Sequence, residues 1–295
     1  MLTVVIPSFH SSKLIIERIN EIKSEIPIII IDNSKNYEFK KEIENKFSNV
    51  KIIIPNENLG WGKAANIGIK ESKTQMVLLS QPDVEFVDNC IEKLSECIKN
   101  FKDFCILTPK DLNNELYTNY EIYNSYKKLE KNNKFNLEEV DFVDLTWLIN
   151  KSHFDDNDLW DENIFLYFEA QDFAKRLKRK KKKIFVAKNI TTYHIGSSSH
   201  DKKLEFYAKL NRNWHYNWSR YYFNKKHYGL LYANRKSIGI VAKLFLKYIR
   251  SLVFFQKNES KLIFAEIHGL ISSVMNKKSF YRPYENINSN SNSKD

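Results

Sequence analysis

Two aspartates stand close to the ends of apolar runs in the sequence. Asp32 follows Ile28–Ile31, and Asp83 follows Met76–Leu79 after a short polar turn. A short, fully apolar run is typical of a strand that is buried on both faces of a parallel sheet. Ligands bind beyond the carboxyl ends of such strands, so both carboxylates are expected at a ligand-binding edge. Taken singly, each aspartate fits a helix cap or a turn equally well.

The second half of the chain offers two further carboxylates and a histidine. Glu169 and Asp172 are three positions apart at the start of a helix-like segment, so they would lie on roughly the same side of that helix. A partly buried carboxylate among aromatic residues is a stronger base than one in water, which suits either residue to proton removal. His194 follows a strand-like run and precedes a Gly-Ser-rich segment. A lone histidine in this position is more often structural than functional.

Alternating strand-like and helix-like segments would position these side chains. The expected strands span residues 2–6, 28–31, 50–54 and 76–79, and the expected helices span 12–24, 37–47 and 62–71. This alternation indicates right-handed βαβ units and a parallel sheet. Further along, strands are expected at 140–149 and 184–187, and a helix is expected at 172–179. Long helical segments rich in Tyr, Trp and Lys then continue to about residue 278.

Six segments, in this order, resemble motifs of family 2 glycosyltransferases. Four of them are VVIPSFHS (4–11), IIIIDNSKN (28–36), NENLGWGKAANIGI (56–69) and LLSQPDVEF (78–86). The other two are FLYFEAQDFAKRLKRKKKKI (165–184) and TYHIGSSS (192–199), which resemble an acceptor-side acidic motif and a histidine motif. The resemblance covers about two thirds of the chain and is greatest to the rhamnosyltransferases that build bacterial surface polysaccharides.

The resemblance implies an α/β protein with a GT-A fold, in which helices flank a Rossmann-like, mostly parallel sheet and a helical extension follows. It also implies an inverting hexosyltransferase. The donor would be a dTDP- or UDP-linked sugar, and the acceptor a glycan or a lipid-linked molecule. The residue types agree with a phosphate-containing donor, because Gly60 and Gly62 leave room for phosphates to approach the backbone. A helix N-terminus near Gly62 would add a partial positive charge there.

Roles for individual residues follow from the same resemblance. The residues implied to bind the nucleotide sugar are Pro7, Ser8, Asp32, Asn58, Gly60, Trp61, Asn66 and Asp83. Asp83 and His194 are implied to hold a divalent metal, Mg²⁺ or Mn²⁺. Asp172 is slightly preferred over Glu169 as the catalytic base.

One position departs from the family pattern. The family carries a second acid directly after the glutamate, often the catalytic base, whereas this chain has Ala170. The alternative prediction is therefore a catalytically impaired GT-A domain that acts as a binding or assembly partner. Donor hydrolysis or transfer by the purified protein would separate the two.

The composition fits a globular protein with an anionic partner. The net charge is +11, and Lys175–Lys183 contains eight basic residues in nine. This run is expected to be a solvated helix end, and nucleic acid is not expected as a partner because no nucleic-acid-binding fold accompanies it. The three cysteines lack the spacing of a disulfide framework or a zinc site and are expected to be ordinary thiols.

The expected organisation has four parts. Residues 1–110 form the nucleotide-sugar-binding half, 111–200 the acceptor-side half, 201–280 a helical extension and 281–295 a disordered tail. Lys243, Lys247 and Arg250 share one face of the apolar segment Ile238–Phe255. This pattern fits an interfacial helix on an anionic membrane, and it fits equally well a helix that packs on the catalytic domain or forms a homodimer contact. No secretory signal is visible, so a cytoplasmic location is expected, with the inner face of the cell membrane as a further site of contact.

Overall fold

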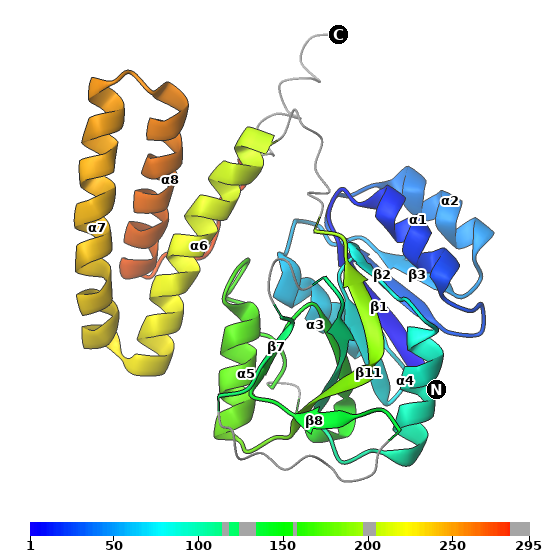
Figure 1. Cartoon of the computed structure of the whole chain (residues 1–295). Coiled ribbons are helices and arrows are strands. Elements are labelled where there is room, and N and C mark those ends of the chain that lie inside the picture. Colours follow the sequence, from blue (N-terminus) through cyan, green and yellow to red (C-terminus); the bar gives the residue numbers. More distant parts are fainter. Residues whose placement is uncertain (114–117, 124–133, 156–157, 197–204, 284–295) are drawn as a thin grey trace. The chain divides into compact units, whose positions relative to one another are not determined.

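The computed structural model describes residues 1–113, 118–123, 134–155, 158–196 and 205–283 (Figure 1). The chain forms two compact units. The first contains Met1–Asp161 and Ala170–Ser199, and the second contains Glu162–Glu169 and His200–Asp295. The boundaries expected at 110 and 280 stay predictions, and most of the expected disordered tail, residues 284–295, lies outside the described residues.

A mixed sheet organises the first unit. Its strands, in spatial order, are β3 (Val50–Ile53), β2 (Ile28–Asp32), β1 (Leu2–Ser8), β4 (Met76–Ser80), β10 (Thr146–Asn150), β6 (Ile106–Asp111), β11 (Ile184–His194) and β5 (Val84–Glu85). Strands β3, β2, β1 and β4 are parallel, as are β6 and β11, whereas β10 runs antiparallel between β4 and β6. Strand β8 (Leu137–Glu139) pairs with β11, and β7 (Tyr120–Glu121) pairs with β9 (Phe142–Val143). The predicted α/β class with a mostly parallel sheet and C-terminal helices is confirmed.

Helices of this unit connect the strands of the sheet. They are α1 (Ser12–Glu21), α2 (Tyr37–Lys46), α3 (Trp61–Glu71), α4 (Cys90–Asn100) and α5 (Glu169–Arg179), with a 3₁₀ turn η1 (Lys151–His153) after β10. The helices expected at 12–24, 37–47 and 62–71 are α1, α2 and α3, with ends shifted by up to three residues. Helix α4 was not anticipated.

The prediction of one continuous strand at residues 140–149 is wrong. The chain breaks it into β9 and β10 at Asp144 and Leu145, and Leu145 takes a left-handed backbone with φ of 69°. Leucine has a Cβ that disfavours this region, so the turn is held by its surroundings rather than by local preference. The break turns the backbone beside the end of β4.

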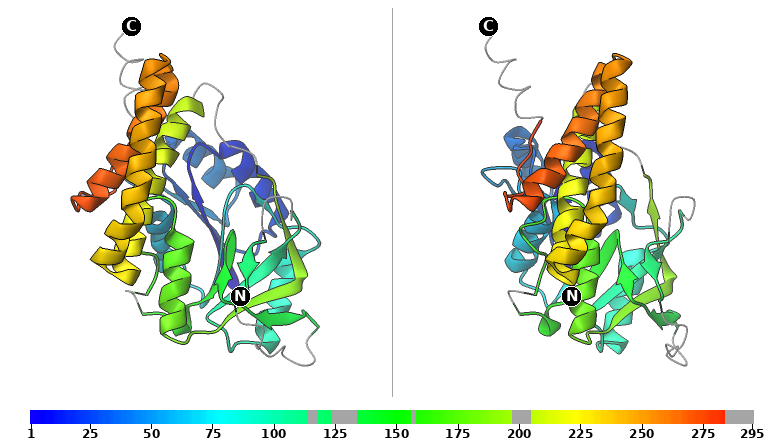
Figure 2. Two further views of the ribbon diagram at one scale, coloured as in Figure 1. Left: turned by 60° about the vertical axis from the view of Figure 1, so that its left-hand side comes forward. Right: turned by 90° about the vertical axis from the view of Figure 1, so that its left-hand side faces the viewer.

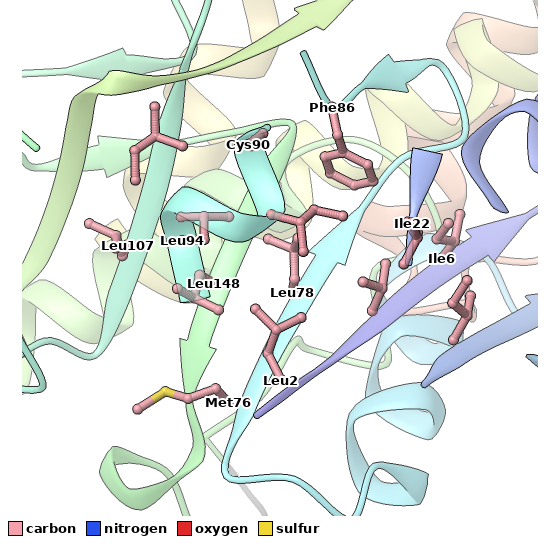
Figure 3. Close-up of a cluster of buried hydrophobic side chains, with 14 of the residues drawn as sticks. Leu2, Ile6, Ile22, Met76, Leu78, Phe86, Cys90, Leu94, Leu107 and Leu148 are labelled. Carbon is pink, nitrogen blue, oxygen red and sulfur yellow. The ribbon is translucent and has the colours of Figure 1, made fainter. Parts of the chain in front are cut away.

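Two apolar clusters cover the two faces of the sheet. One joins β1, β4, β6 and β10 to α1, α2 and α4, and Figure 3 shows side chains of this cluster, among them Leu2, Leu78 and Leu94. The other joins the opposite face to α3 and α5. All three cysteines are buried free thiols, and burial raises the pKa of Cys97 and Cys105 to about 12, which makes them unreactive.

Helix α3 lies unusually close to strand β1. A Cβ atom built on Gly68 would come within 2.3 Å of the Val5 Cγ1 atom, so only glycine permits this approach. At the other side of α3, the rings of Trp61, Trp147 and Trp160 pack with centroids 4.9–5.7 Å apart. These contacts fix the position of the N-terminus of α3 beside the sheet.

Three long helices form most of the second unit. Helices α6 (Glu205–Tyr228), α7 (Leu230–Val253) and α8 (Lys257–Val274) lie side by side (Figures 1 and 2). Trp214 and Trp218 of α6 pack on α8 in a small apolar core. Within the described ranges, every helix falls short of the length and apolar character that crossing a bilayer requires.

Candidate active site

The carboxyl ends of β1 and β2 bring the first predicted residues together. Ser8 and Asp32 are register partners, with Pro7 one residue earlier in β1. Both Asp32 oxygens accept local hydrogen bonds: Ser34 N and Oγ donate to Oδ1 at 3.0 and 2.5 Å, and Asn36 N donates to Oδ2 at 3.0 Å. Asp32 is only 3% exposed. Its carboxylate therefore shapes the loop after β2 and keeps part of its acceptor capacity.

The loop before α3 is anchored to this same edge. The Asn33 side chain accepts from Leu59 N, and the Asn58 side chain accepts from Gly60 N, each at 3.0 Å. Gly60 has φ of 77°, a left-handed conformation that glycine adopts without a Cβ clash. The first backbone N–H groups of α3 have no partner within the helix and form a favourable place for an anion. Sequence reasoning missed Asn33, although it directly follows Asp32.

Asn66 has a different environment from the one predicted for it. The side-chain amide of Asn66 donates to the Trp160 backbone carbonyl at 2.9 Å and accepts from the Trp160 backbone N–H at 3.0 Å. The Asn66 side chain is buried. Trp61 is half-buried against Trp147 and Trp160. Both predicted residues thus join α3 to the segment before α5.

Asp83 and His194 meet at the other half of the edge. Asp83 lies in the turn between β4 and β5, and His194 ends β11. Antiparallel pairing of β5 with β11, and a bond from Ile195 N to the Asp83 carbonyl at 2.9 Å, hold the two residues side by side. The His194 Nε2 and Asp83 Oδ2 atoms are 3.3 Å apart, and both side chains are partly exposed, at 13% and 22%. The bond to Asp83 raises the pKa of His194, although burial opposes this.

Two more aspartates, which the sequence analysis did not single out, interact electrostatically with His194. Asp111 ends β6, and Asp144 lies two residues before β10, whose Thr146 pairs with Ser80 of β4. Both carboxylates interact with His194, and burial raises the pKa of Asp111 and that of Asp144, to about 6 for Asp144. We call Asp83, Asp111, Asp144 and His194 the acid–histidine group. The sequence did offer one signal for Asp144, because this residue is an acid within the mostly apolar segment 140–149.

Asp172 is held inside the first unit. It is fully buried at 0% exposure, and the Arg176 guanidinium donates to its Oδ2 at 2.8 Å. The same guanidinium donates to the carbonyls of Asp158 and Leu159 at 2.8 and 2.5 Å. The pair therefore ties α5 to the segment that also carries Trp160.

The basic run that follows is largely bound to the domain rather than wholly solvated. Lys178 pairs with Asp141 at 3.0 Å, and Lys180 and Lys183 pair with Asp158 and Asp103. The run was expected to be a solvated helix end. Helix α5 ends within it at Arg179, and the paired lysines remain about half exposed, at 50–53%.

Glu169 begins α5 and belongs to the second unit, whereas Asp172 belongs to the first. Glu169 is half-buried and follows Tyr167 and Phe168, which both have φ of 66°. Two successive aromatic residues in the left-handed region are costly, and such strain is found mostly at functional sites. Burial raises the pKa of Tyr167 to about 12, so its hydroxyl stays protonated.

The chemistry of Asp83 and His194 suits a divalent ion. A carboxylate oxygen and an imidazole nitrogen are both ligands for Mn²⁺ and related ions, and Mg²⁺ uses one or two carboxylates together with phosphate oxygens and water. Among the described residues, no three acid, histidine or cysteine side chains converge to hold a metal by themselves. The two residues therefore fit an ion whose remaining ligands come from a phosphorylated substrate and water.

Comparison with solved structures identifies the class of this architecture. The fold is similar to that of the mannosyltransferase PcManGT from Pyrobaculum calidifontis in complex with GDP-Man and Mn²⁺, with a TM-score of 0.54 and 8% identity over 94% of this chain and 88% of that one. It is also similar to TarS from S. aureus, with a TM-score of 0.52 and 15% identity over 92% and 55% of the two chains. A third similar structure is GalNAc-T7 with UDP, GalNAc and Mn²⁺, with a TM-score of 0.50 and 14% identity over 77% and 51%.

These likenesses show a GT-A glycosyltransferase fold, and the chain spans about half the length of TarS and of GalNAc-T7. Residues 3–157 match the model of glycosyl transferase family 2. The match covers more than half of the chain, which therefore belongs to this family of glycosyltransferases. The comparison with curated proteins returned no match.

Proposed function

We propose that this chain transfers a hexose from a nucleoside-diphosphate donor to a glycan or lipid-linked acceptor, with inversion at the anomeric carbon. The observation that carries the proposal is the meeting of Asp83 and His194 at 3.3 Å, at the carboxyl edge of a glycosyltransferase sheet. Similarity to structures that contain GDP-Man, UDP and Mn²⁺ supports this choice of donor class. A rhamnosyl donor and a role in bacterial surface polysaccharide synthesis follow from the sequence resemblance alone.

The donor would lie along the edge from β2 to β11. Pro7, Ser8 and the remaining acceptor capacity of Asp32 would contact a uracil or thymine base. The diphosphate would lie near the N-terminus of α3, where Asn58 and Gly60 set the backbone. Asn66 and Trp61 would act by holding α3 in place, because their described contacts join it to Trp160 and Trp147.

Asp83 and His194 would hold the divalent ion together with the diphosphate. When bound, such an ion neutralises charge on the leaving nucleoside diphosphate. Asp111 and Asp144 add negative potential around His194 and so increase the affinity of this edge for a cation. His194 must release its Nε2 proton to serve as a ligand, so its raised pKa opposes metal binding at acidic pH.

A carboxylate must remove the proton of the acceptor hydroxyl as that oxygen attacks the anomeric carbon. Of the two predicted candidates, Asp172 is fully buried and paired with Arg176, which suits a positioning residue. Glu169 is half-buried at the start of α5, after the strained residues Tyr167 and Phe168. We therefore assign the base role to Glu169 and reverse the slight preference for Asp172 in the sequence analysis.

A screen of nucleotide sugars with Mg²⁺ or Mn²⁺ tests the donor proposal. A ligand present at about a hundred times its dissociation constant adds about 2.7 kcal/mol of stability, which a thermal shift detects. The true donor should raise the melting temperature only when a divalent ion is present. Hydrolysis or transfer of that donor then establishes the activity, and full activity in excess EDTA would exclude the metal role.

Ala170 favours a second candidate function, a GT-A domain that binds donor or acceptor without turnover. Alanine occupies the place of the usual second acid, and its side chain is buried at 5% exposure. Donor binding without hydrolysis or transfer, across a panel of acceptors, would favour this candidate over catalysis.

A further inference from the structure

The positive charge of this protein is concentrated in one stretch. Residues 206–258 contain eleven Lys and Arg residues and no Asp or Glu, so this stretch carries a net charge equal to the +11 of the whole chain. The rest of the chain is electrically balanced. The stretch covers nearly all of α6 and the whole of α7, which belong to the second unit.

Helix α7 is the least buried part of that stretch. Only Ala233, Ser237, Leu244 and Ser251 of its 24 residues are buried, and their spacing of four and seven places them on one face. This buried face packs on α6 and α8. Three of the four buried residues are small, so the large side chains of α7 point elsewhere.

Two further faces of α7 follow from the same helical spacing. The exposed apolar face carries Leu231, Ile238, Phe245, Ile249 and Leu252, which are separated by seven, seven, four and three residues. The exposed cationic face carries Lys236, Lys243, Lys247 and Arg250, separated by seven, four and three residues.

The last residue of α7 and the turn after it extend the apolar face. Val253, Phe254 and Phe255 are all exposed, and the exposed fraction of Phe255 reaches 87%. A contiguous apolar surface of this kind is uncommon on a soluble monomer and marks an interaction site. Exposed Leu246 lies between the apolar and the cationic face on the helical wheel, so apolar and cationic surface meet along one side of α7. The partner must therefore offer apolar material next to negative charge.

We propose that α7 and the following turn bind the surface of an anionic lipid bilayer, with the apolar face in the acyl boundary and the cationic face against the headgroups. An interfacial helix has this combination of large apolar residues and Lys or Arg on adjoining faces. A second copy of the chain fits less well, because the same stretch of the partner, residues 206–258, has no Asp or Glu to meet the cationic face. Nucleic acid would pair with the cations but leave the apolar face in water.

This inference does not depend on glycosyl transfer. Flotation of the purified full chain with vesicles needs neither donor nor acceptor, whereas the donor screen needs no lipid, so the two proposals fail separately. The vesicles contain either phosphatidylcholine alone or phosphatidylcholine with phosphatidylglycerol. Low and high salt are compared because attraction to headgroups is screened by ions.

Three variants define the surface. The cationic variant is Lys243→Gln, Lys247→Gln and Arg250→Gln, and the apolar variant is Ile238→Ser, Phe245→Ser and Ile249→Ser. The matched control is Lys41→Gln, Lys99→Gln and Lys102→Gln, which removes the same charge from exposed positions of the first unit. All nine side chains are exposed, so the fold should survive, and circular dichroism checks this.

The wild type and the control should float with anionic vesicles at low salt and much less with neutral ones. Each cation near an anionic surface favours binding about fivefold, so the cationic variant should bind about a hundredfold more weakly. The apolar variant should lose about tenfold or more at either salt concentration. Wild-type protein that stays with the unbound fraction at low salt overturns the proposal. Equal binding to neutral vesicles also overturns it. So does a dimer in solution that dissociates in the apolar variant alone.

Discussion

The two halves of the sheet edge treat their carboxylates in opposite ways. Asp32, at the end of β2, accepts three hydrogen bonds from its own loop, and its negative charge is met before any ligand arrives. In the acid–histidine group, three carboxylates interact electrostatically with one imidazole, and burial raises the pKa of two of them. A carboxylate whose charge the chain stabilises contributes to the fold, whereas a carboxylate whose pKa burial raises opposes the fold when it is charged and favours a nearby cation.

Asp172 belongs with Asp32 in this comparison. It is buried and bound to Arg176, although its sequence position is that of a catalytic acid. The type of a residue and its place in a motif therefore do not separate structural from chemical carboxylates. At Asp111 and Asp144, burial raises the pKa although the chain supplies hydrogen-bond donors to both carboxylates. Substitutions at carboxylates whose charge the chain stabilises should therefore reduce stability, and those at the others should reduce activity.

The largest effect is expected at the base. Glu169→Gln should lower turnover about 10²–10⁴-fold and leave donor affinity nearly unchanged, because the amide cannot accept the acceptor proton. Asp172→Asn should instead lower the free energy of unfolding by about 2 kcal/mol through its weaker bond to Arg176. Steady-state kinetics and denaturant titration of both variants measure this. If Asp172→Asn loses turnover at unchanged stability and Glu169→Gln stays active, the assignment is reversed.

The next effect is expected at the Asp83–His194 pair. Asp83→Ala and His194→Ala should each lower transfer about 10²–10³-fold, the usual cost of losing one contact that stabilises transition-state charge. Their unfolding free energies should stay within about 0.5 kcal/mol of the wild type, because both side chains are partly exposed. Asp103→Ala, at an exposed acid paired with Lys183, is the matched control and should retain full activity. Wild-type transfer rates in both variants would contradict the metal role.

Much of the nucleotide half could be predicted from the sequence, because its signals are local. Residue types and spacing are enough to predict the strand Ile28–Ile31 that ends beside Asp32, and the helix that begins close to Gly62. The acid–histidine group depends on long-range pairing, since Thr146 meets Ser80 across an antiparallel strand and Asp144 sits in an unforeseen turn. The partners of Asp172 and Asn66 likewise depend on packing, which periodicity does not report.

The third effect is expected at Asp32, whose carboxylate accepts hydrogen bonds from its own loop. Asp32→Ala should lower the free energy of unfolding by about 2–3 kcal/mol, because Ser34 and Asn36 lose the acceptor of their backbone N–H groups. Asp83→Ala, in the other half of the edge, serves as its comparison and should cost far less. Urea titration at pH 7.5 without ligand measures both. Equal costs at the two positions would remove the distinction between the two halves.

The smallest effect is a gain of stability at Asp144. Burial raises the pKa of Asp144 to about 6 in the fold, against an ordinary value of 3.8, so folding favours the protonated form. Such a group destabilises the fold once it is charged, and the loss develops as the pH rises from about 4 through about 6. Asp144→Asn is neutral at every pH, and its amide oxygen can still accept the Leu145 N–H bond that the carboxylate accepts at 2.8 Å.

The variant should therefore be more stable than the wild type by about 1–2 kcal/mol at pH 7.5 and nearly equal to it at pH 4. The comparison is made in EDTA, because a bound cation would favour the charged carboxylate of the wild type. Asp103→Asn, at an exposed acid, is the control and should show no such pH dependence. A gain of equal size at both pH values would mean that packing, not ionisation, causes it. A loss of stability at pH 7.5 would place Asp144 with Asp32 among the carboxylates that the fold requires.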